Sequence, residues 1–137
     1  MKRVFADTFF WLAIANPADQ WHVKVQQVVA SLGAIRLVTT DEALTEFLAG
    51  MAGTGHFGRI QAVHTVHDIL TDDEVTVLPQ THASFLSGLD FYERRLDKGY
   101  SLTDCISMGA CLSENITDIL TNDHHFKQEG FAILIHP

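Results

Sequence analysis

Cysteines and long apolar runs are both scarce in this sequence. Only Cys105 and Cys111 occur among 137 residues, too few for a disulfide framework. They lie six residues apart on one predicted helix, where their side chains point to different faces. A reduced protein with a cytoplasmic location is therefore expected. No apolar run approaches the roughly 20 residues of a membrane span, and no signal peptide is visible, so we expect no membrane partner.

Basic residues are also few. The chain has 9 lysine and arginine residues against 17 aspartate and glutamate residues, a formal net charge of −8 with histidine neutral. This charge argues against a protein that holds nucleic acid by bulk electrostatics. It does not exclude a nuclease, because metal ions can neutralise acids locally. It also leaves room for a basic protein partner.

Short apolar runs alternate with helical patterns along the whole chain, which indicates one domain over residues 1–137. The sequence predicts five strands, at residues 3–6, 35–38, 75–78, 116–120 and 131–135. It predicts helices at residues 9–14, 19–32, 43–51, 57–70, 81–96 and 102–113. This alternation is typical of an α/β fold with a mostly parallel five-stranded sheet and helices on both faces.

Four acidic residues lie at or near the ends of these predicted elements. Asp7 follows the first strand, Asp123 follows the fourth, Asp104 begins a helix and Glu46 lies one or two turns into another. Ligands of parallel sheets bind beyond the carboxyl ends of the strands, where the strand order reverses. If the first and fourth strands are neighbours, the four carboxylates could converge there. Carboxylates are the hard oxygen ligands of Mg²⁺, so the pattern suggests a divalent-metal site and phosphodiester chemistry.

Each carboxylate also has a structural interpretation. All three aspartates stand where a helix N-cap is common. Ser101 with Asp104 three residues later resembles a capping box. Thr39 with Glu42 is a second capping-box pattern, which assigns Glu42 to the backbone. Glu46 could be a solvated helix residue. The case for a metal site therefore depends on all four acids gathering at one edge of the sheet.

The densest basic cluster is Arg94, Arg95 and Lys98, shortly before Asp104. It could be a solvated helix end, where cations suit the helix dipole. It could instead contact RNA phosphates. Both interpretations stay open at the level of sequence.

Eight histidines invite a zinc hypothesis. His64 and His67 are three residues apart on a predicted helix, and His124 and His125 are adjacent. Neither Cys-x-x-Cys nor His-Glu-x-x-His occurs, so zinc is disfavoured. His124 could lie at the rim of the acidic site because it neighbours Asp123.

Four motifs in order carry a family resemblance that covers essentially the whole chain. They are Val4-Phe5-Ala6-Asp7-Thr8; Thr39-Thr40 with Glu46 before Phe47-Leu48; residues 98–105, with Asp104; and residues 119–126, with Thr121 and Asp123, followed by Gly130-Phe131. With these motifs the chain resembles a PIN domain, the nuclease domain of VapC-type toxins of toxin–antitoxin pairs.

The resemblance implies a three-layer α/β/α domain and an endoribonuclease that hydrolyses RNA phosphodiester bonds. Four acids match the family's catalytic metal ligands: Asp7, Glu46, Asp104 and Asp123. The resemblance implies that they bind one or two Mg²⁺ or Mn²⁺ ions. Thr8 and Thr121 match site-orienting positions. A basic antitoxin and a homodimer are implied as partners. One departure is Phe9, where many members have a small polar residue.

Other functions are open or disfavoured. A PIN-like RNA-processing or RNA-binding domain without an antitoxin is the main alternative. A dehalogenase-type phosphatase needs Asp-x-Asp after the first strand, but the chain has Asp7-Thr8-Phe9. A receiver domain needs an aspartate after the third strand, where Leu78-Pro79 stands.

Overall fold

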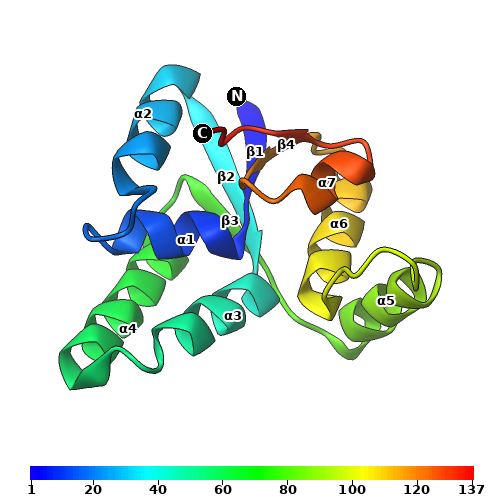
Figure 1. Cartoon of the computed structure of the whole chain (residues 1–137), viewed down its shortest axis with the longest axis horizontal. Coiled ribbons are helices and arrows are strands. Elements are labelled where there is room, and N and C mark those ends of the chain that lie inside the picture. The colour runs from blue at the N-terminus through cyan, green and yellow to red at the C-terminus, as the bar shows by residue number, and fades with distance from the viewer.

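A computed structural model describes all 137 residues, and its strands and helices alternate as predicted (Figure 1). In chain order the elements are β1 (Lys2–Ala6), α1 (Thr8–Ala15), α2 (His22–Leu32), β2 (Ile35–Thr40), α3 (Asp41–Met51), α4 (Gly55–Thr71), β3 (Val75–Leu78), α5 (His82–Glu93), α6 (Leu102–Glu114), β4 (Asp118–Leu120), α7 (His124–Gln128) and β5 (Ala132–Ile133).

The five strands form one sheet in the order β3-β2-β1-β4-β5, and every neighbouring pair is parallel. The predicted α/β fold with a five-stranded parallel sheet is confirmed. The strand order reverses between β1 and β4, where Phe5 pairs with Ile119 and Ala6 pairs with Leu120. The first and fourth strands are therefore neighbours, which is the condition for the four acids to converge.

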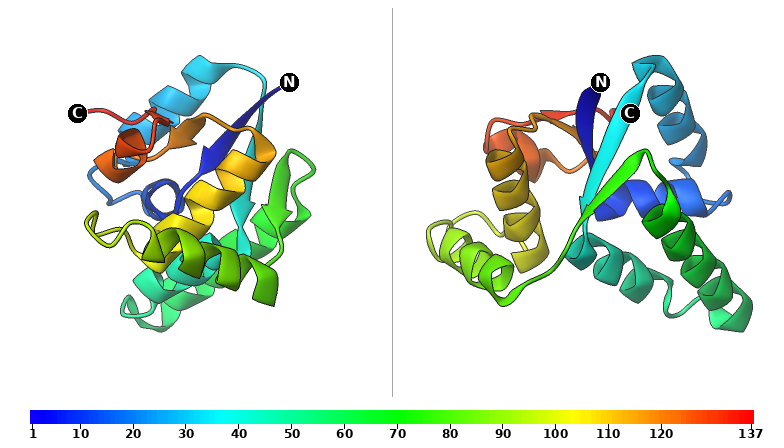
Figure 2. Two further views of the ribbon diagram at one scale, coloured as in Figure 1. Left: turned by 90° about the vertical axis from the view of Figure 1, so that its right-hand side faces the viewer. Right: turned by 180° about the vertical axis from the view of Figure 1, so that it is seen from behind.

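Alternating side chains of the central strands fill two separate cores, one on each face of the sheet. Val4 and Ala6 of β1 pack into a core with side chains of α1, α2, α3 and α4. Phe5, which points to the opposite face, packs with Cys105 of α6 and Phe126 of α7. Figures 1 and 2 show the sheet between these two groups of helices, with α1, α2 and α4 on one side and α5, α6 and α7 on the other. The three-layer arrangement follows from strands that are apolar on both faces.

Several element boundaries differ from the prediction. Helix α2 begins at His22 rather than at residue 19, because the Asp19 side chain accepts a hydrogen bond from Trp21 N at 2.7 Å and closes a turn. Strand β4 begins at Asp118 rather than at residue 116. The short helix α7 was not predicted.

The predicted role of Glu42 in a capping box is wrong. Helix α3 begins one residue later than that pattern requires, so its N-cap is Thr40, whose hydroxyl accepts a hydrogen bond from Ala43 N at 3.0 Å. Glu42 instead accepts a hydrogen bond from the Ser84 hydroxyl at 2.9 Å and links α3 to α5.

Both cysteines belong to α6, where they are free and buried in the core. No helix combines the length and the apolar character that a membrane crossing requires.

Candidate active site

The four predicted acids come together at the carboxyl ends of β1 and β4. An open cavity of about 540 Å³ lies there. It is lined by Asp7, Thr8, Phe9, Leu12, Glu46, Asp104, Asn122, Asp123 and His124. Because β1 and β4 are neighbours and parallel, the residues that follow them face one crevice, as the strand order predicts.

Asp7 is the most buried of these acids, with only 6% of its surface exposed. It stands at the N-cap position of α1, but its side chain makes no capping hydrogen bond. Its Oδ2 accepts a hydrogen bond from the Thr121 hydroxyl at 2.9 Å. The pKa of Asp7 is raised to about 7, mainly by burial and to a smaller extent by the charges of Asp104 and Glu46, while the Thr121 hydrogen bond opposes the increase. Helix capping therefore does not explain this carboxylate.

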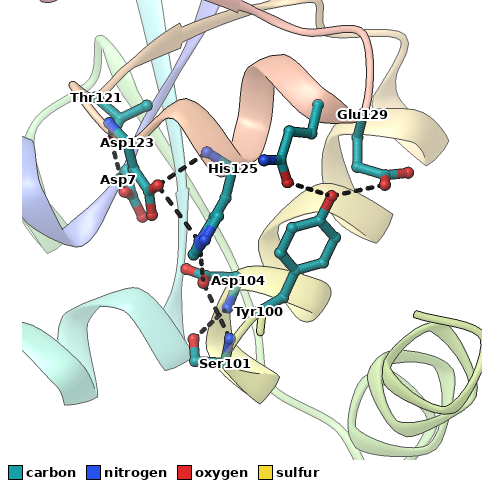
Figure 3. Close-up of polar contacts among 9 residues, drawn as sticks. Asp7, Tyr100, Ser101, Asp104, Thr121, Asp123, His125 and Glu129 are labelled. Carbon is teal, nitrogen blue, oxygen red and sulfur yellow. Dashed lines mark hydrogen bonds and ion pairs between the residues drawn. The ribbon is translucent and has the colours of Figure 1, made fainter. Parts of the chain in front are cut away.

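The two threonines connect the elements around the cavity by hydrogen bonds. The Thr121 hydroxyl donates to Asp7 and accepts from Asp123 N at 3.1 Å, so one side chain fixes both acids (Figure 3). The Thr8 hydroxyl donates to the Ala43 carbonyl at 3.4 Å and ties α1 to the start of α3. Both threonines are buried.

Asp104 and Asp123 act as helix caps, so their structural interpretation is confirmed. Asp104 Oδ2 accepts from Ser101 N at 3.0 Å and completes a capping box with the Ser101 hydroxyl. Asp123 Oδ1 accepts from His125 N at 2.9 Å at the start of α7. The second oxygen of each carboxylate accepts no hydrogen bond from the protein, and both residues line the cavity. Each cap thus orients a carboxylate toward the site.

Electrostatic crowding is visible at Asp104 as well. Burial raises the pKa of Asp104, and the nearby charges of Asp123 and Glu46 add to the increase, although the Ser101 backbone N–H opposes it. Glu46 makes no hydrogen bond or ion pair, and it reaches the cavity from α3. A cation in the cavity would relieve this repulsion between like charges.

His125 lies beside two of the acids, a position that the sequence did not predict. Its Nδ1 lies 3.4 Å from Asp123 Oδ1 and 3.9 Å from Asp104 Oδ2. The histidine singled out beforehand, His124, does line the cavity, but it is exposed at the rim. The adjacent pair after Asp123 was the available signal, and the single turn of α7 decides which of the two rings faces inward.

The basic cluster lies outside the cavity. Arg94 pairs with Asp90 at 3.1 Å, and Lys98 pairs with Asp97 at 3.4 Å. The Arg95 guanidinium pairs with Glu129 at 3.0 Å. Contact of these cations with RNA phosphates stays a prediction.

The residues present fit a divalent cation. Asp104, Asp123 and His125 place one ligand atom each within 4.8 Å of one another, and Asp7 and Glu46 add oxygens to the same cavity. His125 Nδ1 is buried without a hydrogen-bond partner, as a nitrogen kept for a ligand would be. This group contains neither His64 nor His67, so the structure gives no support to a zinc site on α4.

Comparisons with known proteins agree with this geometry. The family model described as PIN domain matches residues 4–131. No curated protein matches the sequence significantly. The fold resembles VapC20 of Mycobacterium tuberculosis, described as a sarcin–ricin loop cleaving toxin, with a TM-score of 0.85 and 22% identity over 97% of this chain and 99% of that chain.

Two further solved structures share the fold at lower similarity. VapBC2 from Rickettsia felis, bound to a DNA fragment from its promoter, has a TM-score of 0.65 and 14% identity over 96% of each chain. FitAcB from Neisseria gonorrhoeae has a TM-score of 0.62 and 15% identity over 96% of each chain. At these identities the likeness shows a common fold.

Proposed function

Because the chain belongs to the PIN domain family, we propose that it is a divalent-metal-dependent endoribonuclease that hydrolyses RNA phosphodiester bonds. The observation that carries the proposal is the meeting of Asp7, Glu46, Asp104 and Asp123 in one open cavity. Carboxylate oxygens are the ligands of Mg²⁺ and Mn²⁺, the two cations we propose for the site.

The protein's own residues hold and orient the reacting groups. When bound, a divalent cation supplies Lewis-acid activation of water and neutralises negative charge on the phosphodiester. Thr121 fixes Asp7 and Asp123 relative to one another through its hydroxyl. The capping bonds fix Asp104 and Asp123, so the ligands are arranged before substrate binds.

The biological role that we propose is that of a VapC-type toxin inhibited by an antitoxin. The likeness in fold to a sarcin–ricin loop cleaving toxin supports an RNA substrate. A net charge of −8 and an acidic cavity would complement a basic antitoxin protein. Two free, buried cysteines suit a reduced, cytoplasmic compartment. Family resemblance adds a homodimer to the proposal.

The direct test is cleavage of total cellular RNA with Mg²⁺ or Mn²⁺ by the wild type and by Asp104→Asn. Asp104 is the third residue of α6 and accepts from the N-cap backbone of Ser101, and an amide oxygen can accept the same bond, so the variant keeps α6 and loses the charge. Cleavage should fall by about 100-fold or more, the scale for losing one electrostatic group at an active site. Asp90→Asn, a matched change at an exposed residue of α5, should cleave as the wild type does.

Two results would contradict the proposed function. One is wild-type cleavage that persists in excess EDTA. The other is an Asp104→Asn protein that cleaves as fast as the Asp90→Asn control.

A further inference from the structure

The His125 ring is held in one orientation at the edge of the acidic site. Its Nδ1 has almost no exposed surface and no hydrogen-bond partner, while Asp104 and Asp123 lie on the side that Nδ1 faces (Figure 3). A buried ring nitrogen without a partner is unfavourable unless something binds it. The free nitrogen therefore calls for a ligand in the space between these residues.

Neighbouring residues fix the ring in this place. The Tyr100 ring packs against the His125 ring with 5.2 Å between centroids. The Tyr100 hydroxyl donates to Glu129 Oε2 at 2.8 Å, and Glu129 accepts three further bonds from Arg95. Glu129 directly follows α7, so this network anchors the helix that carries His125. The imidazole is a positioned group, as a ligand to a metal needs to be.

The separations match those of ligands that share one cation. Two ligand atoms at roughly 2.1 Å from a metal lie about 3 to 4.2 Å apart, from the adjacent to the opposite arrangement. His125 Nδ1 is 3.4 Å from Asp123 Oδ1 and 3.9 Å from Asp104 Oδ2, within that range. With the ring proton on Nε2, Nδ1 presents its lone pair to the same cation.

We propose that His125 Nδ1 is a metal ligand beside Asp104 and Asp123, and that it makes the site prefer Mn²⁺ to Mg²⁺. The proposal concerns the metal site of the proposed nuclease and rests on that function. Mg²⁺ is a hard ion that takes oxygen ligands, whereas imidazole suits transition-metal ions. A site built only from carboxylate oxygens lacks this basis for preferring Mn²⁺ to Mg²⁺. The histidine would thus set which cation the protein carries.

The test uses the whole chain with Mn²⁺ or Mg²⁺ alone as the probe. Pulsed electron paramagnetic resonance of Mn²⁺ bound to protein carrying ¹⁵N-histidine should show a directly coordinated nitrogen. Titration calorimetry should show tighter binding of Mn²⁺ than of Mg²⁺ by about tenfold or more. His125→Ala should lose the nitrogen coupling and weaken Mn²⁺ binding by about 10–100-fold, the range for changes around metal ligands. Mg²⁺ binding should change by less than about threefold.

The adjacent His124→Ala variant is the matched control, because its ring lies outside the group of ligand atoms. It should keep the coupling and the ratio of the two dissociation constants. Should His125→Ala fail to fold by circular dichroism, His125→Asn replaces it. No nitrogen coupling in the wild type, or coupling that survives in the His125 variant, overturns the proposal. So does failure of the wild type to bind Mn²⁺.

The two proposals fail in different ways. If the protein cleaves RNA but its Mn²⁺ has only oxygen ligands, the proposed role of His125 is wrong and the proposed nuclease function stands. If the wild type binds Mn²⁺ through nitrogen but cleaves no RNA, the proposed nuclease function is wrong and the assignment of His125 as a ligand stands.

Discussion

At the scale of single residues, Asp7 carries a large electrostatic penalty. The side chain is buried beside two other acids, and its pKa of about 7 is far above the value of 3.8 for a free aspartate. In the metal-free folded protein at neutral pH, the buried Asp7 carboxylate either carries an unfavourable negative charge or keeps its proton. Replacement by asparagine removes that choice and keeps an oxygen that can accept from Thr121.

The metal-free protein should therefore lose stability as pH rises. Between about pH 4 and pH 7 the folded state keeps the Asp7 proton and the unfolded state has lost it, so the free energy of unfolding falls with pH. The loss is roughly 4 kcal/mol at most, for a shift of about three pKa units. Asp7→Asn in EDTA should lack this slope and be more stable than the wild type above pH 7, as measured by urea unfolding. Parallel pH profiles for the two proteins would show that Asp7 does not hold the raised pKa.

The acids could be predicted from sequence, and the histidine could not. Asp7 and Asp123 follow apolar strands, and parallel strands end at one edge of a sheet, so their meeting follows from the fold class. His125 reaches the site through one helical turn after Asp123. A five-residue helix is too short to show an apolar period, so nothing in the sequence indicated which ring turns inward. The predicted capping role of Glu42 was wrong for a related reason. Helix α3 starts one residue later than the pattern indicated, and such a shift changes every capping partner.

At the scale of elements, α7 is anchored by a hydrogen-bond network that no sequence pattern indicates. Glu129 is 12% exposed at its side chain and accepts from both Arg95 and Tyr100. Hydrogen bonding to Arg95 lowers the pKa of Glu129. The two bonding partners precede α6, so Glu129 joins the end of α7 to the segment between α5 and α6. Arg95 thus has a structural role beside any contact with RNA.

Breaking this network should loosen α7. Glu129→Gln replaces the charged acceptor of Arg95 and Tyr100, and hydrogen bonds to charged groups contribute about 1.5–3 kcal/mol each. We expect a loss of stability on that scale by urea unfolding, together with faster amide exchange in residues 124–128. Glu114→Gln, which loses an exposed pair with Arg3, should change stability by less than about 1 kcal/mol. Equal losses in both variants would mean that the network contributes no more than a surface ion pair.

The strands and long helices were predictable because their apolar patterns are long enough to give a period. The limits of the strands were harder to predict. Strand β4 has three residues instead of the five expected, because only Asp118–Leu120 pair with β1 or β5. Which residues of a strand form hydrogen bonds depends on its partner strands, so the sequence of one strand does not predict its paired length.

At the scale of the whole molecule, a cation in the cavity should act as a stabiliser. A ligand that binds only the folded state contributes about 2.7 kcal/mol at 100 times its dissociation constant. For a chain of this size that is a rise in Tm of about 10 °C. Differential scanning calorimetry with increasing Mn²⁺ should show it, and Asp104→Asn should show a smaller rise at the same concentrations. A full wild-type rise in that variant would place Asp104 outside the metal site.

The pairing of β1 with β4 has a consequence for the chain during its synthesis. Thr121 follows Asp7 by 114 residues, and their hydrogen bond forms only where the first and fourth strands meet. At about 5–20 residues per second, a ribosome needs roughly 6 to 23 seconds to add that stretch. Throughout this time the nascent chain holds Asp7 but lacks Asp123, so the acidic site is incomplete. The four acids can therefore gather at one edge of the sheet only after synthesis has passed Asp123 and β4 has paired with β1.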